Sequence, residues 1–408
     1  MIFEAGRGGH RLDYVHRILT ELTKRRFQGS IVFVLTPDFK DHLDNELVEA
    51  AQKRNDLELI YTSEVELRRC KSRSSLLRRL NTYDVFERYL RATNADLGFV
   101  NYLDTILPVL ALPLVGRSGA AVAGILFRPT VHYPDQDKMP QTGQSLGTRV
   151  RDRFSAKAED LIYRQGLRNP RLISVLSLDP LFPDYARRRY RGGEKVKTLP
   201  EPFSTPRSQE PAEQSSDRIT FVLFGTISHR KGLIETIDAL MELSPQEASR
   251  VRLVVAGRIQ GDLRTQAERR VQALVHHQPT IEVDLRVGFV PDDELVNLIR
   301  SSHVVLAPYR RHVGSSGILV WAAHYRRPVI SQSYGLMGIL VRRYRLGLVC
   351  NPADTNALAN CIRRAIVEGP ETLGNPSGMA EYAAANDTRS FIDALFGALG
   401  LMSDESAT

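Results

Sequence analysis

Short apolar runs alternate with helix-length segments along most of the chain, and this order limits the folds it can adopt. From residue 219 the runs are ITFVLF, RLVVAG, VDLRVGFV, HVVLAPY, RPVIS and LGLVCNP. After the first run, Leu233, Ile237 and Leu240 recur at helical spacing. Apolar strands that alternate with helices predict a parallel sheet covered by helices on both faces. The second half of the chain is therefore predicted to be an α/β domain.

The first half repeats this alternation less clearly. Its strand candidates are MIFEA and residues 30–37, 57–63, 97–102, 121–129 and 172–177. Residues 200–218 are rich in proline, serine and charge and have no apolar period, which predicts a linker. We expect an α/β fold of two Rossmann-like, doubly wound domains. The predicted boundaries are 1–199, the linker 200–218, 219–380, and a cross-over helix and tail at 381–408.

Length and charge fit this organisation and narrow the classes of partner. A chain of 408 residues is too long for one ordinary core. A formal charge of +8 favours an anionic partner: nucleic acid, an acidic lipid surface or a phosphorylated small molecule. No nucleic-acid motif is present, and no apolar stretch reaches membrane-spanning length. The N-terminus lacks a secretory signal pattern, so we expect a cytoplasmic protein.

The segment SHRKGL, residues 228–233, lies where the strand at 219–224 passes into a helix. Loops at the carboxyl ends of parallel strands are where open α/β sheets bind ligands, and free amides at a helix start favour an anion. Arg230 and Lys231 add two positive charges, while Gly225 and Gly232 allow close approach of the backbone. This pattern predicts a phosphate or diphosphate site. A surface turn with solvated cations is the alternative.

A second loop, RRHVGSSGIL at residues 310–319, also follows a strand and precedes a helix. Gly314, Ser315, Ser316 and Gly317 supply small residues, two hydroxyl groups and exposed amides. Because both loops leave one parallel sheet at the same edge, we expect them to converge on one ligand. Serine also caps helices for structural reasons, so a purely structural role stays open.

The order FGTISHRKGL, VVAG, VGFVPDDELVNLIRSSHVVLAPY and RPVISQSYGLMGILVRRYRLGLV resembles the donor half of the family 4 glycosyltransferases of GT-B fold. The resemblance covers nearly all of residues 219–365 and is looser before residue 204. It implies two Rossmann-type domains across a cleft, with a nucleotide-diphospho-sugar, UDP- or GDP-linked, held by the second. It also implies transfer with retention, no required cofactor or metal, and a last helix crossing back to the first domain.

Position by position, the resemblance places Lys231 at the donor diphosphate. Thr226 stands where the family usually has an arginine, and Arg230 is a candidate to replace that charge. The backbone at Phe289 and Val290 would lie near the nucleotide base.

In the first half, Gly8, Gly9 and His10 resemble the glycine loop that lies over phosphate and acceptor. Asn101 falls near the position of a histidine often found after the fourth strand of the family, and Asp104 is close to it. Asn101 and Asp104 are therefore grouped with Arg230 and Lys231 as catalytic candidates.

This chain departs from the family at two positions. Family members usually carry two glutamates eight residues apart, and Val313 and Trp321 occupy those positions. Neither side chain can bind a sugar hydroxyl through a carboxylate. The departure indicates either a divergent branch with its own donor contacts or a protein that has lost catalysis, and we favour the divergent branch.

Two further segments allow alternative interpretations. PDQDK, residues 134–138, has the Asp-x-Asp pattern of metal-dependent transferases of another fold. Two carboxylates are too few ligands to make a metal site convincing, so we expect no metal. Residues 67–91 carry Leu76, Leu77, Leu80 and Tyr83 at helical spacing, with arginines around them. That pattern suits a helix on an anionic membrane surface. A solvated helix packed by its leucines is the alternative that we favour slightly.

Together these features predict a glycosyltransferase that moves a sugar from a nucleotide-sugar to an unidentified carbohydrate or lipid-linked acceptor, in envelope or exopolysaccharide synthesis. One rival is a non-catalytic GT-B protein that binds a partner transferase or a glycan. Another is a sugar-nucleotide epimerase of the same architecture.

Overall fold

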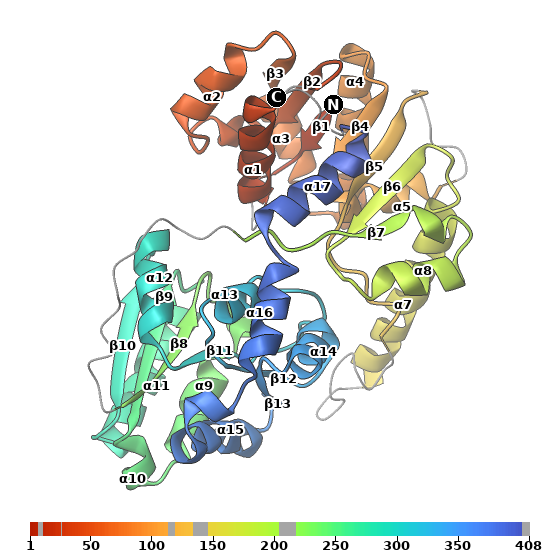
Figure 1. The fold of residues 1–408 in the computed structure, drawn as a ribbon. Helices are drawn as coiled ribbons and strands as arrows, with labels where there is room; N and C mark the ends of the chain where they lie inside the picture. The colour runs from red at the N-terminus through yellow and green to blue at the C-terminus, as the bar shows by residue number, and fades with distance from the viewer. Residues whose placement is uncertain (7–10, 26, 113–118, 134–145, 204–217, 402–408) are drawn as a thin grey trace. The chain divides into compact units, whose positions relative to one another are not determined.

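The chain forms two compact units, each built on one parallel sheet, in a computed structural model (Figure 1). The structure describes residues 1–6, 11–25, 27–112, 119–133, 146–203 and 218–401, with the backbone alone over 146–154. Unit 1 consists of Met1–His132, Gln144–Pro202 and Thr388–Thr408. Unit 2 consists of Tyr133–Gly143 and Phe203–Asp387.

Unit 1 contains a seven-stranded sheet in the order β3-β2-β1-β4-β5-β6-β7. Its strands are β1 (Ile2–Glu4), β2 (Ile31–Leu35), β3 (Leu57–Tyr61), β4 (Leu97–Val100), β5 (Ala121–Leu126), β6 (Leu172–Ser177) and β7 (Val196–Thr198). Its helices are α1 (Arg11–Lys24), α2 (Asn45–Gln52), α3 (Glu64–Cys70), α4 (Ser75–Ala92), α5 (Leu107–Leu110), α7 (Leu146–Gly166), α8 (Phe182–Arg189) and α17 (Thr388–Leu399). The strand order reverses between β1 and β4, as in a doubly wound sheet.

Successive strand residues in unit 1 point to opposite faces of the sheet, and both faces are buried. Ile2 and Phe33 pack in a core with residues of α1, α2 and α17. Phe3 and Val34 pack in a second core with residues of α4, α5, α7 and α8. The continuous apolar runs of the sequence follow from this cover on both sides.

Helix α17 belongs to unit 1 although it follows all of unit 2 in the sequence. Phe391, Ile392 and Leu395 are at most 1% exposed and join the core under α1. The ring of Phe391 lies 5.0 Å from that of Tyr14 on α1, centroid to centroid. The predicted return of the last helix to the first domain is confirmed.

Unit 2 contains a six-stranded sheet in the order β10-β9-β8-β11-β12-β13. Its strands are β8 (Ile219–Phe224), β9 (Val251–Gly257), β10 (Glu282–Val287), β11 (Val304–Ala307), β12 (Val329–Gln332) and β13 (Gly347–Cys350). Its helices are α9 (Leu233–Met241), α10 (Pro245–Ala248), α11 (Leu263–His277), α12 (Asp292–Ser301), α13 (Ile318–His324), α14 (Gly335–Tyr344), α15 (Thr355–Glu368) and α16 (Pro376–Ala384). Here the order reverses between β8 and β11.

The predicted fold class is confirmed, because all neighbouring strands in both sheets pair in parallel. Strand β7 was not predicted, since VKT has three residues and no apolar run. Among the described helices, none is both long enough and apolar enough to span a membrane.

Candidate functional site

The two loops singled out in the sequence leave β8 and β11, the strands between which the sheet of unit 2 reverses its order. Open α/β sheets bind ligands outside the carboxyl ends of the strands at this point. After β8 the chain turns at Gly225, with φ 93°, and enters a short 3-10 helix at His229–Lys231. Gly232, with φ 74°, then starts α9, and a Cβ there would overlap the carbonyl oxygen of Pro308. Glycine is required at both turns.

Lys231 lies inside this junction and is 8% exposed. Its Nζ donates a hydrogen bond to the carbonyl oxygen of Phe224, 2.9 Å away, at the end of β8. Nζ also lies 5.0 Å from the ring centroid of Tyr309, a cation–π contact. An ammonium has three N–H bonds, and the Phe224 carbonyl accepts one of them. A Cβ at Gly225 would lie 3.4 Å from Nζ, so the glycine leaves space beside the ammonium.

The two loops meet, as the parallel sheet predicts. The backbone N–H of Arg310 donates to the carbonyl oxygen of Arg230 at 2.7 Å. The guanidinium of Arg230 lies 2.7 Å from Nδ1 of His312 and stacks over Tyr309 at 5.0 Å. Arg310 in turn pairs with Glu235 on α9. Arg230 is therefore held between the loops.

His312 is 5% exposed, and the partners of its two ring nitrogens assign its tautomer. Nε2 lies 2.8 Å from the carbonyl oxygen of Ser315, which can only accept a hydrogen bond. Nδ1 lies against Arg230, which can only donate one. In this arrangement Nε2 donates to the carbonyl of Ser315, and Nδ1 accepts from Arg230.

Side chains at the end of β12 support the loop after β11. The Gln332 side chain accepts a hydrogen bond from the N–H of Tyr309 at 3.3 Å and donates one to the carbonyl of His312 at 3.4 Å. The hydroxyl of Tyr334 donates to the carbonyl of Tyr309 at 2.9 Å and accepts from the N–H of Arg311 at 2.9 Å. Three adjacent strands, β8, β11 and β12, therefore define the position of this loop.

The segment Gly314–Gly317 completes the loop and leads into α13. Gly314 is buried, whereas Ser315, Ser316 and Gly317 are half-buried. The hydroxyls of Ser316 and Tyr309 lie 3.2 Å apart. With seven residues, α13 is a short helix and has only a weak dipole. The polar character of this segment therefore comes mainly from the serine hydroxyls and the backbone amides.

Val313 and Trp321 make structural contacts. Neither has a carboxylate that could bind a sugar hydroxyl. The carbonyl of Val313 accepts from the N–H of Leu336 at 2.7 Å, which ties the loop to α14. Trp321 packs edge-on against Phe203 at 5.1 Å and lies 6.4 Å from Phe224, the last residue of β8. A large aromatic side chain therefore lies near the end of β8, at the position where the resemblance to family 4 predicts a glutamate.

The loop after β10 carries the residues predicted to lie near a nucleotide base. Phe289 is 80% exposed and Val290 is half-buried. The N–H of Gly288 donates to the carbonyl of Gly257 at 3.1 Å, which holds this loop beside the end of β9. Thr226, after β8, is exposed.

The remaining catalytic candidates lie in unit 1. Asn101, at the end of β4, is completely buried. Asp104 accepts hydrogen bonds from the backbone N–H groups of Phe127, at 2.9 Å, and Arg128, at 3.3 Å. Burial raises the pKa of Asp104, and those two N–H groups oppose the rise. Asp104 thus ties the segment after β4 to the segment after β5.

Sequence reasoning missed a buried carboxyl beside Asn101. Glu4, the last residue of β1, is 1% exposed. Its Oε1 accepts from the N–H of Gly6 at 3.0 Å and lies 3.4 Å from the guanidinium of Arg11. Burial raises the pKa of Glu4 to about 7, against the opposing effects of Arg11, two backbone amides and Asn101. A glutamate inside the first apolar run is the sequence signal that could have revealed this group.

Three predicted glycine-loop residues, Gly8, Gly9 and His10, lie outside the described residues, as do residues 134–138. Over the part of the chain that the structure describes, no group of three or more His, Cys, Asp or Glu side chains could hold a metal ion. The cysteines are free thiols.

Comparisons with known proteins agree with this arrangement. Residues 218–368 match the family model described as glycosyl transferases group 1, so unit 2 carries a glycosyltransferase domain. This match contains both loops of the site. It confirms the prediction of a glycosyltransferase. It does not distinguish family 4 from other glycosyltransferase families. No curated protein matches the chain.

Solved structures share the fold over nearly the whole length. The N-terminal domain of a Candida albicans trehalose-6-phosphate phosphatase has a TM-score of 0.65 at 11% identity, covering 98% of this chain and 96% of that one. Anabaena Alr3699/HepE in complex with UDP has a TM-score of 0.61 at 16% identity, covering 98% of each chain. A trehalose-6-phosphate protein from E. coli, bound with UDP-2-fluoro glucose, has a TM-score of 0.61 at 14% identity, covering 98% of each.

Proposed function

We propose that the chain is a retaining glycosyltransferase, a divergent member of family 4, that moves a sugar from a UDP- or GDP-sugar to an unidentified acceptor. The observation that carries this proposal is the junction of the loops after β8 and β11. There Arg230 and Lys231 lie at the strand-order reversal, inside the span that matches a glycosyltransferase model. We assign acceptor binding to residues 1–199 and donor binding to residues 219–380.

The junction supplies positive charges that would stabilise a nucleoside diphosphate as it leaves the sugar. Negative charge grows on the diphosphate as its bond to the sugar breaks, and fixed cations stabilise that state more than the ground state. Lys231 would contact the diphosphate from beside Gly225, and Arg230, fixed by His312, would add the second charge. The acceptor hydroxyl can lose its proton to the departing phosphate. No strong side-chain nucleophile is required.

The other predicted contacts stay part of the proposal. Gly314, Ser315, Ser316 and Gly317 would donate polar groups to the donor, and the exposed loop at Phe289 and Val290 would contact the base. In unit 1, Asn101, Asp104 and the loop Gly8–His10 would serve the acceptor side.

UDP is the first nucleotide to test, because HepE was solved with UDP and the E. coli protein with UDP-2-fluoro glucose. The basic character of the chain, a net charge of +8, agrees with an anionic donor. A carbohydrate or lipid-linked acceptor in envelope or exopolysaccharide synthesis completes the proposal.

A thermal-shift panel of UDP, GDP, ADP and their sugars tests donor binding. A ligand at 100 times its Kd stabilises the folded state by about 2.7 kcal/mol, which raises the melting temperature measurably. We expect one nucleotide series to stabilise the wild type and to stabilise Lys231→Ala much less. Arg343→Gln, at an exposed cation on α14, is the matched control. No shift with any nucleotide would contradict the proposal.

Val313 and Trp321 favour the main rival, a non-catalytic protein that binds a partner transferase or a glycan. In that case a glycan would stabilise the chain, and nucleotides would leave its melting temperature unchanged. Release of a free 2-epimer from a UDP-sugar without acceptor would instead identify the epimerase.

A further inference from the structure

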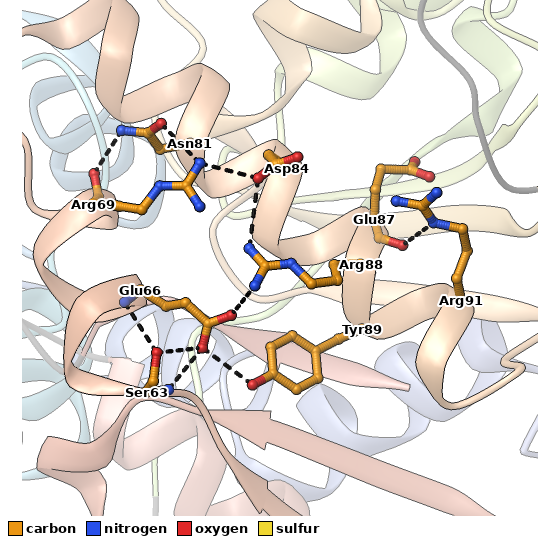
Figure 2. A network of polar contacts seen from close by, with 9 residues as sticks. All are labelled: Ser63, Glu66, Arg69, Asn81, Asp84, Glu87, Arg88, Tyr89 and Arg91. Carbon is orange, nitrogen blue, oxygen red and sulfur yellow. Dashed lines mark hydrogen bonds and ion pairs between the residues drawn. The ribbon is translucent and has the colours of Figure 1, made fainter.

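Two groups of basic side chains lie on helices of unit 1, and they differ in their acidic partners. In the network of α3 and α4, Arg88 pairs with Glu66 at 2.6 Å and Arg69 pairs with Asp84 at 3.1 Å (Figure 2). Each cation of these two pairs has its own acid, and the pairs hold α3 against α4. The leucines predicted to pack α4 are exposed: Leu76, Leu77 and Leu80. That prediction is therefore wrong, and the second half of the helix, with Phe86 completely buried, supplies the packing.

The second group lines a cavity of about 440 Å³ between α7 and α8. Lys157 and Arg164 come from α7, and Arg189 comes from α8. Among the described lining residues these three cations face one acid, Asp160, which leaves a net charge of +2. Lys157, Asp160 and Arg164 are three and four residues apart, so they lie on one side of α7. The cavity therefore has more cations than its own acid can match.

Asp160 joins the two helices at this cavity. Its carboxylate accepts hydrogen bonds from Tyr190 at 2.8 Å, Arg164 at 3.0 Å and Arg189 at 3.4 Å. Burial alone would raise the pKa of Asp160, but these three partners hold the pKa below its usual range. A guanidinium has five N–H groups, so both arginines keep donors that Asp160 does not use. Their side chains are 42% and 47% exposed, which leaves those donors within reach of a ligand.

Apolar surface lies beside these charges. Leu161, on the same side of α7, is 56% exposed. Tyr185 on α8 is half-buried, and its ring lies 6.3 Å from that of Phe182 and 6.0 Å from that of Tyr190, centroid to centroid. These contacts hold the ring in place while Tyr185 lines the cavity. The cavity thus combines apolar surface with a few charged groups, as small-molecule sites do.

We propose that this cavity binds an anionic saccharide, that is, a sugar carrying a carboxylate or a phosphate group. Arginine presents paired N–H groups that match the oxygens of either group, and Lys157 adds a third charge. The C–H face of a sugar ring packs on Tyr185 and Leu161, and a sugar hydroxyl donates to Asp160. Inorganic phosphate would leave the apolar surface uncovered, and a neutral saccharide would leave the cations unpaired.

This site goes beyond the proposed function. The cavity lies in unit 1 and shares no residue with the loops after β8 and β11. Saccharide binding there needs no nucleotide-sugar. Failure of this proposal and failure of the proposed transferase activity are therefore distinguishable.

Isothermal titration calorimetry of the full chain, without nucleotide, tests the proposal. The probes are tetragalacturonic acid, which carries carboxylates, glucose 6-phosphate, which carries a phosphate, and the neutral maltotetraose. We expect at least one anionic saccharide to bind, with an affinity that falls as salt rises, and maltotetraose not to bind. Binding of only one anionic probe would support the proposal and identify the group that the arginines recognise.

Two sets of substitutions assign the binding to the cavity. Arg164→Gln and Arg189→Gln together should weaken it at least about 10-fold, the size of one lost charge-assisted hydrogen bond. Lys157→Gln and Leu161→Ser together change only exposed side chains and should weaken it roughly 5-fold. The second set keeps the proposal testable if circular dichroism shows that loss of both arginines disturbs the fold.

A matched control carries Arg168→Gln and Ile173→Ser, at exposed positions of unit 1 outside the cavity lining. It should bind the saccharide like the wild type. Absence of binding to both anionic probes, or equal affinity of all variants, would overturn the proposal. Tighter binding of tetraglutamate than of either saccharide would assign the cavity to an acidic peptide and also overturn it.

Discussion

The buried carboxyl of Glu4 gives a pH dependence of stability with a definite sign. Burial raises the pKa of Glu4 from 4.5 to about 7, so the folded state holds its proton more tightly than the unfolded state does. Stability from this group is fully present below pH 4.5 and is lost as the pH rises to about 7. Glu4→Gln replaces the carboxyl by a neutral group of the same shape and removes this loss.

The expected magnitude follows from the same shift. One pKa unit corresponds to about 1.36 kcal/mol, so a rise from 4.5 to about 7 corresponds to about 3 kcal/mol. Between pH 4 and pH 8 the free energy of unfolding of Glu4→Gln should therefore rise by about 3 kcal/mol relative to that of the wild type. Altered contacts with Arg11 and Gly6 change the absolute stability of the variant. They cancel largely from the comparison between the two pH values.

Urea unfolding at pH 4 to 8, followed by far-UV circular dichroism, measures this difference. The chain has one tryptophan, Trp321 in unit 2, so its fluorescence reports separately on the unit without Glu4. Glu58→Gln, at an exposed position on β3, is the control for loss of one surface charge. If wild type and Glu4→Gln lose stability in parallel as the pH rises, the account of Glu4 is refuted.

Three further substitutions test the site and its scaffold. Lys231→Ala should lower kcat at least about 100-fold, since it removes a cation from the departing diphosphate, and circular dichroism should show an intact fold; unchanged turnover would remove Lys231 from the site. His312→Ala should release Arg230 and raise KM for the nucleotide-sugar, with His312→Asn restoring part of the loss; kinetics identical to wild type would contradict this positioning role. Gly257→Ala should destabilise unit 2 by about 2 kcal/mol or more in urea unfolding, because a Cβ would overlap the carbonyl of Gly225. Gly261→Ala, with a positive φ but open space around it, should cost only about 1 kcal/mol, and equal losses would contradict the overlap argument.

Periodicity predicted the sheets well because strands buried on both faces must be apolar throughout. The meeting of the two loops also followed from the sequence, since parallel strands place their carboxyl ends at one edge. Residues 219–224 and 303–309 correspond to β8 and β11, and their loops join at Arg230 and Arg310.

Contacts between residues far apart in the sequence could not be predicted from periodicity. Gln332 and Tyr334 support the loop after β11 only because β12 lies beside β11 in the sheet. The leucine pattern of α4 was ambiguous for a similar reason. Spacing defines one side of a helix, whereas tertiary packing decides whether that side meets the core or the solvent.

The placement of α17 has a consequence for how the protein is made. Unit 1 draws Phe391, Ile392 and Leu395 into its core, yet the ribosome produces these residues after every residue of unit 2. During synthesis this core of unit 1 therefore has its residues from α1 and α2 but lacks those of α17 until unit 2 has been made. The core of unit 1 is therefore complete only after the whole of unit 2 has been synthesised.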